Sequence, residues 1–431
     1  MPATVSDPID VAAEPSSPAS DPVELLVAPR PELDFDANLE RLASTRCLPP
    51  FAAEAQAFMK DVSRTILRDR SMAAHPELMA MAHSLRPAQV VELERQFEDR
   101  NSGRVRRGVG LAFHIAPANV DTLFAYSWFL SLLSGNPNLV RVSGRRGEAV
   151  QRLVEILAGI LEKPEHAAVR ERSLVVSYGR ADAVTTAISS RCRLRIIWGG
   201  DATVDHLRSL PLESRAREIA FADRFSLAAL SATAVNRASS DELATLAKSF
   251  VNDAFWFDQN ACSSPRAIYW LGTEDEAEGA RERLWPLVEG HLRANDWRLP
   301  PAAMVARMTA VQSLAARGVV QRVQGEVNAR GILRLTAGKL DETARTGHPA
   351  GGVFYEYVIE SLDELDEILS PRDQTMTVWG IARRDLESWI AGRHGVGVDR
   401  IVPVGRALDF DSVWDGQDLF DVFTDEVTLS T

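Results

Sequence analysis

The sequence predicts an α/β protein built from two domains. Short strand-like segments alternate with amphipathic helical segments along most of the chain, an order typical of mostly parallel sheets covered by helices on both faces. The length of 431 residues exceeds what one ordinary core accommodates, which indicates a second domain.

The N-terminal third begins with a leader and continues with helices. Residues 1–33 are rich in Ala, Pro, Ser and Asp, so we expect a disordered segment. Apolar side chains then recur every three or four residues from Phe51 to Ile66, which predicts a helix. A second helix is expected over residues 87–99. Residues 104–115 predict one or two strands, and residues 122–133 predict an apolar helix.

The alternation then becomes regular. Strands are predicted at residues 139–142, 173–178 and 193–198, with helices between them. Ligands bind at the carboxyl ends of such strands, where turn N–H groups and helix N-termini are exposed. Gly199 and Gly200 stand at the end of the third strand. They are not a full G-x-G-x-x-G motif, so a plain strand-to-helix turn is the alternative to a cofactor site.

A second α/β unit follows, and we place the boundary near residue 235. The domains are then 34–235 and 236–404, and we expect residues 405–431 to return to the first domain or to an oligomer interface. An amphipathic helix over residues 241–255 leads into this unit. Strands at 219–221 and 226–230 complete the first domain. The second has strands at 267–271, 332–335, 353–359, 375–379 and 400–404 and helices at 274–292 and 301–316.

Composition excludes several function classes. No apolar run is long enough to cross a bilayer, and the N-terminus lacks a basic region followed by an apolar core, so we expect a soluble, cytoplasmic protein. The net charge of −12 argues against nucleic-acid binding. The three cysteines form no C-x-x-C pair and the eight histidines show no H-E-x-x-H spacing. We therefore expect neither a disulfide framework nor a metal site.

Cys262 is the candidate nucleophile. It lies in F-W-F-D-Q-N-A-C-S-S-P (residues 255–265), between a helix and a strand and among small and polar residues. A thiol at such a junction can face a cleft, whereas a structural cysteine is usually packed inside an apolar run. Lone cysteines are common, so position alone leaves both interpretations open.

Several motifs together resemble the LuxC-type acyl-CoA reductases, a family of the aldehyde dehydrogenase superfamily. The resemblance spans roughly residues 104–417. The matching segments are P-A-N-V (117–120), S-G-N (134–136) with L-V-R-V-S (139–143), I-I-W-G-G (196–200), D-Q-N-A-C-S-S-P (258–265), R-I-V-P-V-G-R-A-L-D (400–409) and V-W-D-G (413–416).

The resemblance implies an aldehyde dehydrogenase-like fold with a Rossmann-type cofactor domain and a catalytic domain that carries Cys262. It also implies NADPH-dependent reduction of a fatty acyl thioester, on CoA or a carrier protein, to an aldehyde. An acyl-protein synthetase partner, a role in luminescence and a homo-oligomer are further implications.

The family match also assigns site residues. Cys262 takes the acyl group, and the Asn119 amide with the Cys262 backbone N–H holds the oxyanion. Arg141 stands where the superfamily usually has a lysine that binds the adenosine ribose, and a guanidinium suits a 2′-phosphate. Ser143, Gly199 and Gly200 line the same cofactor site. Each also has a plainer interpretation as a turn or surface residue.

One departure bears on the reaction. Aldehyde-oxidising relatives place a glutamate near residues 219–223 to activate water, and the matching position here is Ala220. Glu218 lies on the same strand face and is a candidate base for Cys262. The alternatives are an NAD-dependent aldehyde dehydrogenase, acylating or hydrolytic, and a non-catalytic protein that carries acyl groups. The aromatic residues Trp128, Phe129 and Trp256 either line an acyl tunnel or belong to the core.

Overall fold

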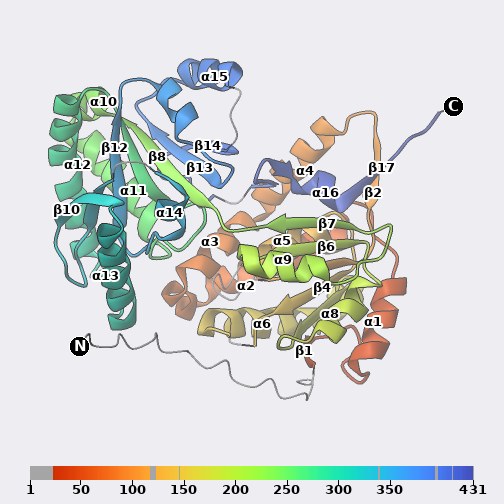
Figure 1. Cartoon of the computed structure of the whole chain (residues 1–431). Coiled ribbons are helices and arrows are strands. Elements are labelled where there is room, and N and C mark those ends of the chain that lie inside the picture. Colours follow the sequence, from red (N-terminus) through yellow and green to blue (C-terminus); the bar gives the residue numbers. More distant parts are fainter. Residues whose placement is uncertain are drawn as a thin grey trace, which may run out of the picture.

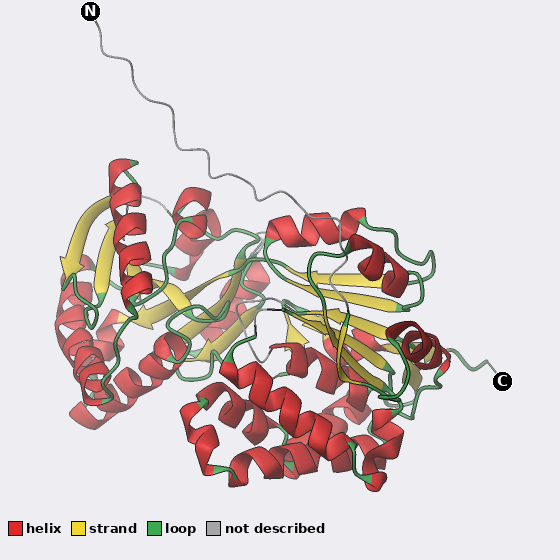
Figure 2. Ribbon diagram, turned by 90° about the horizontal axis from the view of Figure 1, so that it is seen from below, coloured by secondary structure: helices red, strands yellow, loops and turns green. Residues whose placement is uncertain are grey.

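A computed structural model describes residues 23–116, 123–144, 146–337, 340–393, 397–409 and 411–430. The chain forms two α/β units, each built on its own sheet (Figure 1). Figure 2, seen from below, shows the two sheets side by side with helices packed around them. No helix in these ranges is long and apolar enough to cross a membrane.

The first sheet has six strands in the order β1-β5-β4-β3-β6-β7. Its strands run parallel except β1, which pairs antiparallel with β5. The central strands are buried on both faces, as their continuous apolar sequences predict. The bounds are β1 Glu24–Val27, β3 Ala112–Ile115, β4 Asn138–Val142, β5 Ser173–Ser177, β6 Leu194–Trp198 and β7 Arg217–Phe221.

Helices cover both faces of this sheet and bury its apolar side chains in two core clusters. The long helix α2 buries the periodic apolar face predicted from residues 51–66, including Phe58 and Val62. The bounds are α1 Phe35–Ser44, α2 Ala53–Arg68, α3 Pro76–Ser84, α4 Pro87–Arg100, α5 Leu123–Leu133, α6 Glu148–Leu161, α7 Ala167–Arg170, α8 Asp182–Ser189 and α9 Asp201–Ser209.

The second sheet has seven strands in the order β10-β11-β12-β9-β8-β13-β14. It is parallel except for the edge pair β10 and β11. The bounds are β8 Phe225–Ser231, β9 Pro265–Leu271, β10 Val320–Gly325, β11 Leu333–Ala337, β12 Val353–Ile359, β13 Asp373–Trp379 and β14 Arg400–Pro403.

The helices of the second unit have local start signals. Ser239 and Glu242 form a capping box at the start of α11, and Thr273 and Glu276 do the same for α12, so free N–H groups of each first turn are satisfied. The bounds are α10 Ala232–Arg237, α11 Ser240–Phe255, α12 Glu274–Ala294, α13 Pro301–Ala316, α14 Glu342–Thr346 and α15 Arg383–Gly392.

The C-terminal segment runs back to the first unit. Strand β17 (Thr424–Val427) pairs antiparallel with β2 (Val105–Gly108), and α16 (Leu419–Phe423) buries its apolar side chains in the core of the first unit. A short hairpin, β15 (Val413–Trp414) with β16 (Gln417–Asp418), precedes α16.

Two sequence expectations need correction. The segment 1–33 was expected to be disordered, but Glu24–Val27 forms the edge strand β1, because it pairs with β5 and its apolar residues pack into the cores on the two faces of the sheet. The boundary near residue 235 was also misplaced. Strand β8 pairs with β9 and β13 of the second sheet, so the chain changes sheets at residues 222–224.

Candidate active site

A cavity of about 320 Å³ lies where the two sheets meet. One wall is formed by residues at and beyond the ends of β6 and β7, and the other by residues at or near the starts of β8, β9 and β13. The carboxyl edge of the first sheet therefore faces the amino edge of the second. The charged residues of the lining are four arginines and three aspartates: Arg224, Arg266, Arg345, Arg372, Asp201, Asp223 and Asp415.

Cys262 is half-buried and lines this cavity. It lies on the loop between α11 and β9, as the sequence predicted. The Ser226 hydroxyl donates a 2.6 Å hydrogen bond to the Cys262 carbonyl, and the Ser264 hydroxyl donates a 2.7 Å bond to the Asp253 carbonyl. These bonds fix both sides of the thiol in position.

Gln259 shapes the loop that carries Cys262. Its Nε2 donates to the carbonyls of Pro265 and Val353, each at 2.8 Å, and its Oε1 accepts from the N–H groups of Gly352 and Val353. The side chain is fully buried. Its backbone has a φ of 66°, a left-handed conformation that non-glycine residues rarely adopt and that such a network can hold.

The groups around the Cys262 thiol shift its pKa in opposite directions. Burial raises the pKa of Cys262 to about 11, and the carboxylate of Asp415 adds to this rise. Arg266 and a side-chain hydrogen bond from Gln374 lower the pKa of Cys262. The free thiol is thus mostly protonated at neutral pH, and a thiolate formed there would face one cation and one amide donor.

Asp415 holds the amide of Gln374. Gln374 Nε2 donates to Asp415 Oδ1, and Arg224 Nε donates to Asp415 Oδ2 at 3.0 Å. Burial raises the pKa of Asp415. The Oε1 of Gln374 is buried and has no partner within the described ranges. A buried acceptor without a donor on a cavity wall points to a ligand group that supplies one.

His348 also lines the cavity, but its two ring nitrogens are engaged. Nε2 donates to the Val353 carbonyl at 3.0 Å, and Nδ1 accepts from the Ala350 N–H at 3.1 Å. Burial and the charge of Arg266 hold the pKa of His348 well below its ordinary value. The imidazole is therefore neutral and is not a free proton acceptor for Cys262.

Gly199 and Gly200 lie on the opposite wall. Gly200 is the N-cap of α9, where backbone N–H groups and the helix dipole favour anions. A Cβ at Gly200 would lie 3.0 Å from Asp223 Oδ2. The preceding Trp198 also lines the cavity and stacks on Phe221, and its buried Nε1 has no acceptor in the described part of the chain.

Arg141 and Ser143 lie at the carboxyl end of β4, one strand away from β3 and two from β6. Arg141 donates to the Tyr178 carbonyl at 3.1 Å and its guanidinium lies over the Tyr178 ring. Burial lowers the pKa of Arg141, and the neighbouring cation Arg180 lowers it further. No ion pair among the described residues neutralises either arginine, and Arg141 Nε lacks a partner there.

Of the two other residues predicted to be catalytic, the structure describes only Glu218. Asn119 lies outside the described residues. Glu218 is a correction: it faces Arg195 across β6 and β7, with Arg195 Nε 2.7 Å from its Oε2, and Arg208 contacts its other oxygen. It precedes the cavity-lining Phe221 by three residues, about 10 Å along the strand. Two arginines hold its carboxylate, and it does not line the cavity.

The three aromatic residues considered for an acyl tunnel lie in two different environments. Trp128 and Phe129 are fully buried and pack against Phe58 in the core of the first unit. Trp256 is 41% exposed. None of these three lines the cavity. For Trp128 and Phe129 the helical spacing reflects core packing.

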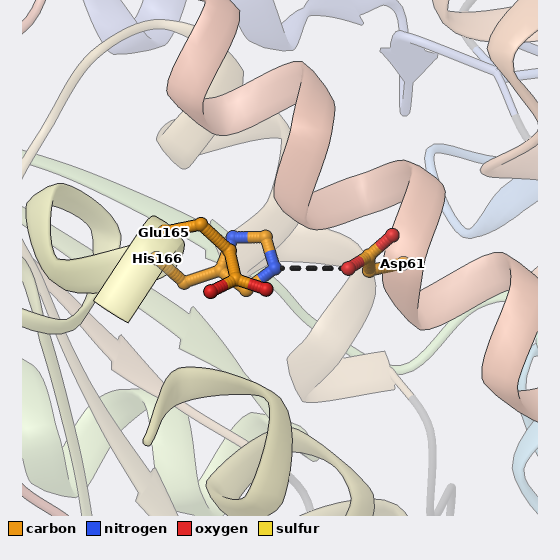
Figure 3. A group of neighbouring side chains, drawn as sticks. All are labelled: Asp61, Glu165 and His166. Atoms are coloured by element: carbon orange, nitrogen blue, oxygen red, sulfur yellow. Dashed lines mark hydrogen bonds and ion pairs between the residues drawn. The ribbon is translucent and has the colours of Figure 1, made fainter. Parts of the chain in front are cut away.

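A separate polar cluster, none of whose residues lines the cavity, lies on the first unit (Figure 3). The ligand atoms of Asp61, Glu165 and His166 lie within 4.8 Å of one another. His166 is buried and its Nε2 is 3.1 Å from Asp61 Oδ2, which links α2 to the turn before α7. His166 Nδ1 lacks the hydrogen-bonded partner that usually orients a metal-binding histidine.

Sequence reasoning missed the residues that surround the thiol. Arg266, His348, Gln374 and Asp415 come from four segments that meet only in the folded chain. The one local signal was the V-W-D-G segment (413–416), because it contains Asp415. The backbone of Asp415 has a φ of 48°.

Comparisons with known proteins agree with this geometry. A family model described as acyl-CoA reductase (LuxC) matches residues 57–319. No curated relative matches the sequence. Solved structures share the fold over nearly the whole chain.

Aldehyde dehydrogenase 21 from Physcomitrella patens, solved with the reaction product succinate, has a TM-score of 0.65 at 13% identity, covering 91% of this chain and 87% of that one. Lactaldehyde dehydrogenase from Escherichia coli gives 0.64 at 14% identity, covering 94% and 95%. An NAD-dependent benzaldehyde dehydrogenase from Corynebacterium glutamicum gives 0.62 at 13% identity, covering 95% and 94%. The fold is that of the aldehyde dehydrogenases.

Proposed function

The chain belongs to the LuxC acyl-CoA reductase family, and from that membership we propose that it reduces a fatty acyl-CoA to the aldehyde through an acyl-enzyme on Cys262, with NADPH as the reductant. The observation that carries the proposal is the position of Cys262. Its thiol lines a cavity whose opposite wall is the Gly199–Gly200 turn at the start of α9. Cys262 and the Gly199–Gly200 turn, where we propose that the cofactor binds, therefore lie on opposite sides of the same cavity.

The residues at and beyond the ends of β6 and β7, which form one wall of the cavity, fit a nicotinamide dinucleotide phosphate. The start of α9 offers N–H groups to a pyrophosphate, and the two glycines leave room for its close approach. Trp198, which lines the same cavity, has a buried Nε1 donor without a partner in the described part of the chain. Arg141, on β4 two strands from β6, and the neighbouring cation Arg180 have no ion-pair partner among the described residues, and two such cations suit a 2′-phosphate. When bound, this group supplies the hydride.

The chain itself performs the acyl transfer. The Cys262 thiolate attacks the thioester carbonyl, the bond from that carbon to the CoA sulfur breaks, and CoA leaves as a thiolate that takes up a proton. Arg266 favours the thiolate because it is the cation beside the sulfur, and the Gln374 amide donates to the same sulfur. Asp415 positions that amide. The Cys262 backbone N–H is the proposed oxyanion donor, together with Asn119.

The surroundings of the acyl-enzyme favour reduction over hydrolysis. By the family resemblance, Ala220 stands at the position of the water-activating glutamate, and it packs against the core of the first unit. No glutamate lines the cavity within the described residues. Without such a base, water attacks the acyl-enzyme slowly and the intermediate persists. We further propose that the protein works in the cytoplasm as a homo-oligomer, with an acyl-protein synthetase as a source of acyl groups.

Intact-protein mass spectrometry tests the proposal. Wild-type protein mixed with a long-chain acyl-CoA and no cofactor should gain the mass of one acyl group. The adduct should be absent in Cys262→Ala and retained in Cys192→Ala, since Cys192 is fully buried. Subsequent NADPH should remove the adduct and release aldehyde. An adduct that survives Cys262→Ala, or one that NADPH leaves intact, contradicts the proposal; the second result would favour a protein that only carries acyl groups.

A further inference from the structure

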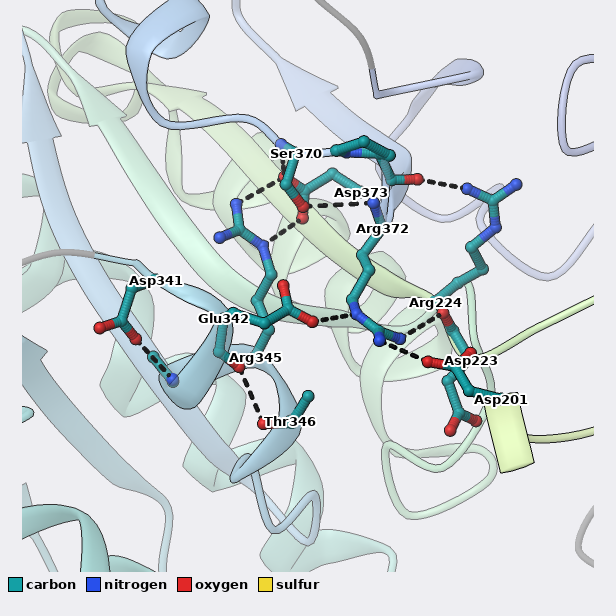
Figure 4. A network of polar contacts seen from close by, with 12 residues as sticks. Asp201, Asp223, Arg224, Asp341, Glu342, Arg345, Thr346, Ser370, Arg372 and Asp373 are labelled. Atoms are coloured by element: carbon teal, nitrogen blue, oxygen red, sulfur yellow. Dashed lines mark hydrogen bonds and ion pairs between the residues drawn. The ribbon is translucent and has the colours of Figure 1, made fainter. Parts of the chain in front are cut away.

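Arg372 joins the two units across the cavity (Figure 4). It lies in the turn before β13 of the second sheet. Its Nη2 donates to the carboxylate of Asp201 in the first turn of α9, and its Nη1 donates to the Asp223 carbonyl at 3.2 Å. Its Nε donates to Glu342 at the start of α14. The side chain is 27% exposed, so solvent and ligands can reach it.

The Asp201 carboxylate lies where an anionic ligand is expected. A helix N-terminus favours one negative charge, and here Asp201 supplies that charge from within the helix. A pyrophosphate at the same place would meet the repulsion of Asp201 and the attraction of Arg372. Trp198 lines the same cavity, and its buried Nε1 has no acceptor within the described ranges.

The other three arginines of the cavity are committed elsewhere. Arg345 binds the fully buried Asp373 with two hydrogen bonds of 3.0 and 2.7 Å. Arg224 binds Asp415. Arg266 lies beside Cys262. Arg372 alone among these four has an acidic partner on the helix that begins at the Gly199–Gly200 turn.

We propose that Arg372 is a cofactor-binding residue that exchanges the Asp201 carboxylate for the pyrophosphate of the dinucleotide. The inference rests on the proposed function, which places a dinucleotide at the start of α9. A guanidinium can bind two phosphate oxygens side by side. Because Nε is held by Glu342, the exchange needs only the two terminal nitrogens to change partner. Arg372 belongs to the second sheet, so the exchange also ties cofactor binding to the domain that carries Cys262.

Opposite changes in affinity test the exchange. NADPH binding is measured by the fluorescence of the reduced nicotinamide, without acyl-CoA or turnover. Arg372→Gln should weaken NADPH binding at least tenfold, because a charge-assisted contact is lost. Asp201→Asn should tighten NADPH binding severalfold, because a competing carboxylate is removed. Adenosine 2′-monophosphate, which lacks the pyrophosphate, should bind all three proteins equally. Arg383→Gln is the matched control, since Arg383 is 90% exposed on α15 and its one ion pair within the described residues is with Glu387.

The outcomes distinguish a failure of the Arg372–Asp201 exchange from a failure of the proposed function. If both Arg372→Gln and Asp201→Asn weaken NADPH binding and lower the melting temperature together, the pair is a structural bridge and the inference is overturned. If Arg372→Gln binds NADPH like the wild type, the inference alone fails. A folded wild-type protein that binds no dinucleotide overturns the proposed function and the inference with it.

Discussion

Asp253 on α11 accepts a 2.6 Å hydrogen bond from the backbone N–H of Gly405 in the C-terminal segment. Its second oxygen accepts from the Ala407 N–H at 2.9 Å. Asp253 also accepts through its carbonyl from Ser264, two residues beyond Cys262. One residue thus fixes both the thiol loop and the segment that carries Trp414 and Asp415 into the cavity.

This contact predicts a pH dependence of stability. Burial raises the pKa of Asp253 from 3.8 to about 7 in the folded protein. The folded state therefore holds a proton that the unfolded state has lost, and this stabilisation disappears as the pH rises from about 4 through 7. Between pH 5 and pH 8 we expect the wild type to lose about 3 kcal/mol more unfolding free energy than Asp253→Asn, measured by urea denaturation. Equal losses in both proteins would refute this assignment.

The thiol predicts opposite effects of two neighbouring charges. The pKa of Cys262 is raised by burial and by Asp415 and lowered by Arg266. At pH 8, iodoacetamide should therefore label Cys262 faster in Asp415→Asn and slower in Arg266→Gln than in the wild type, each by roughly tenfold for a pKa change near one. Labelling is followed by peptide mass spectrometry, which separates Cys262 from Cys47. Rates that change in the same direction would show that the two variants disturb the loop rather than the charge balance.

Glu218 predicts a loss of stability without a loss of acyl transfer. Arg195 is 2% exposed and depends on Glu218 for its charge partner. Glu218→Gln should cost about 2–4 kcal/mol in urea unfolding, because a buried charge loses its counter-ion. Acylation of Cys262 should stay at the wild-type rate. Glu213→Gln, which breaks a more exposed pair with Arg193, is the control and should cost less than about 1 kcal/mol. If folded Glu218→Gln no longer acylates Cys262, the result would support Glu218 as the base for Cys262.

Arg141 predicts the choice between the two nicotinamide cofactors. Its Nε lacks a partner in the described part of the chain and Arg180 is the neighbouring cation. Arg141→Met should weaken NADPH binding about tenfold or more and leave NADH binding unchanged, because only NADPH carries the 2′-phosphate. Arg152→Met on α6, which removes ion pairs with Asp69 and Glu155, serves as the control. Equal weakening of both cofactors would exclude a 2′-phosphate contact.

Local sequence signals predicted most of the strands, the Gly199–Gly200 turn on one wall of the site and the loop that carries Cys262 on the other. Strand ends and the loop before β9 are local features, so Gly199, Gly200 and Cys262 could be placed from periodicity and turn residues. Continuous apolar segments separated by helical segments also predicted the central strands of both sheets. The family resemblance added the chemistry that these positions alone left open.

The side chains around Cys262 and the bridge made by Arg372 depend on contacts that no local pattern encodes. Gln374 reaches Asp415 across 41 residues, and Arg372 reaches Asp201 across 171. Glu218 was misassigned because strand alternation predicts which face a side chain occupies but not its height along the strand. Strand β1 was missed because an edge strand is short and its low-complexity neighbours hid its alternation.

The C-terminal segment ties the molecule together in a second way. The chain leaves the first sheet at residues 222–224, yet Leu419, Phe420 and Phe423 lie buried back in the core of that first unit. A single cut by a protease within 222–224 would therefore give two fragments that still share a core. The halves of this protein should co-purify after such a cut, and two separately produced fragments divided there should reassemble around the thiol.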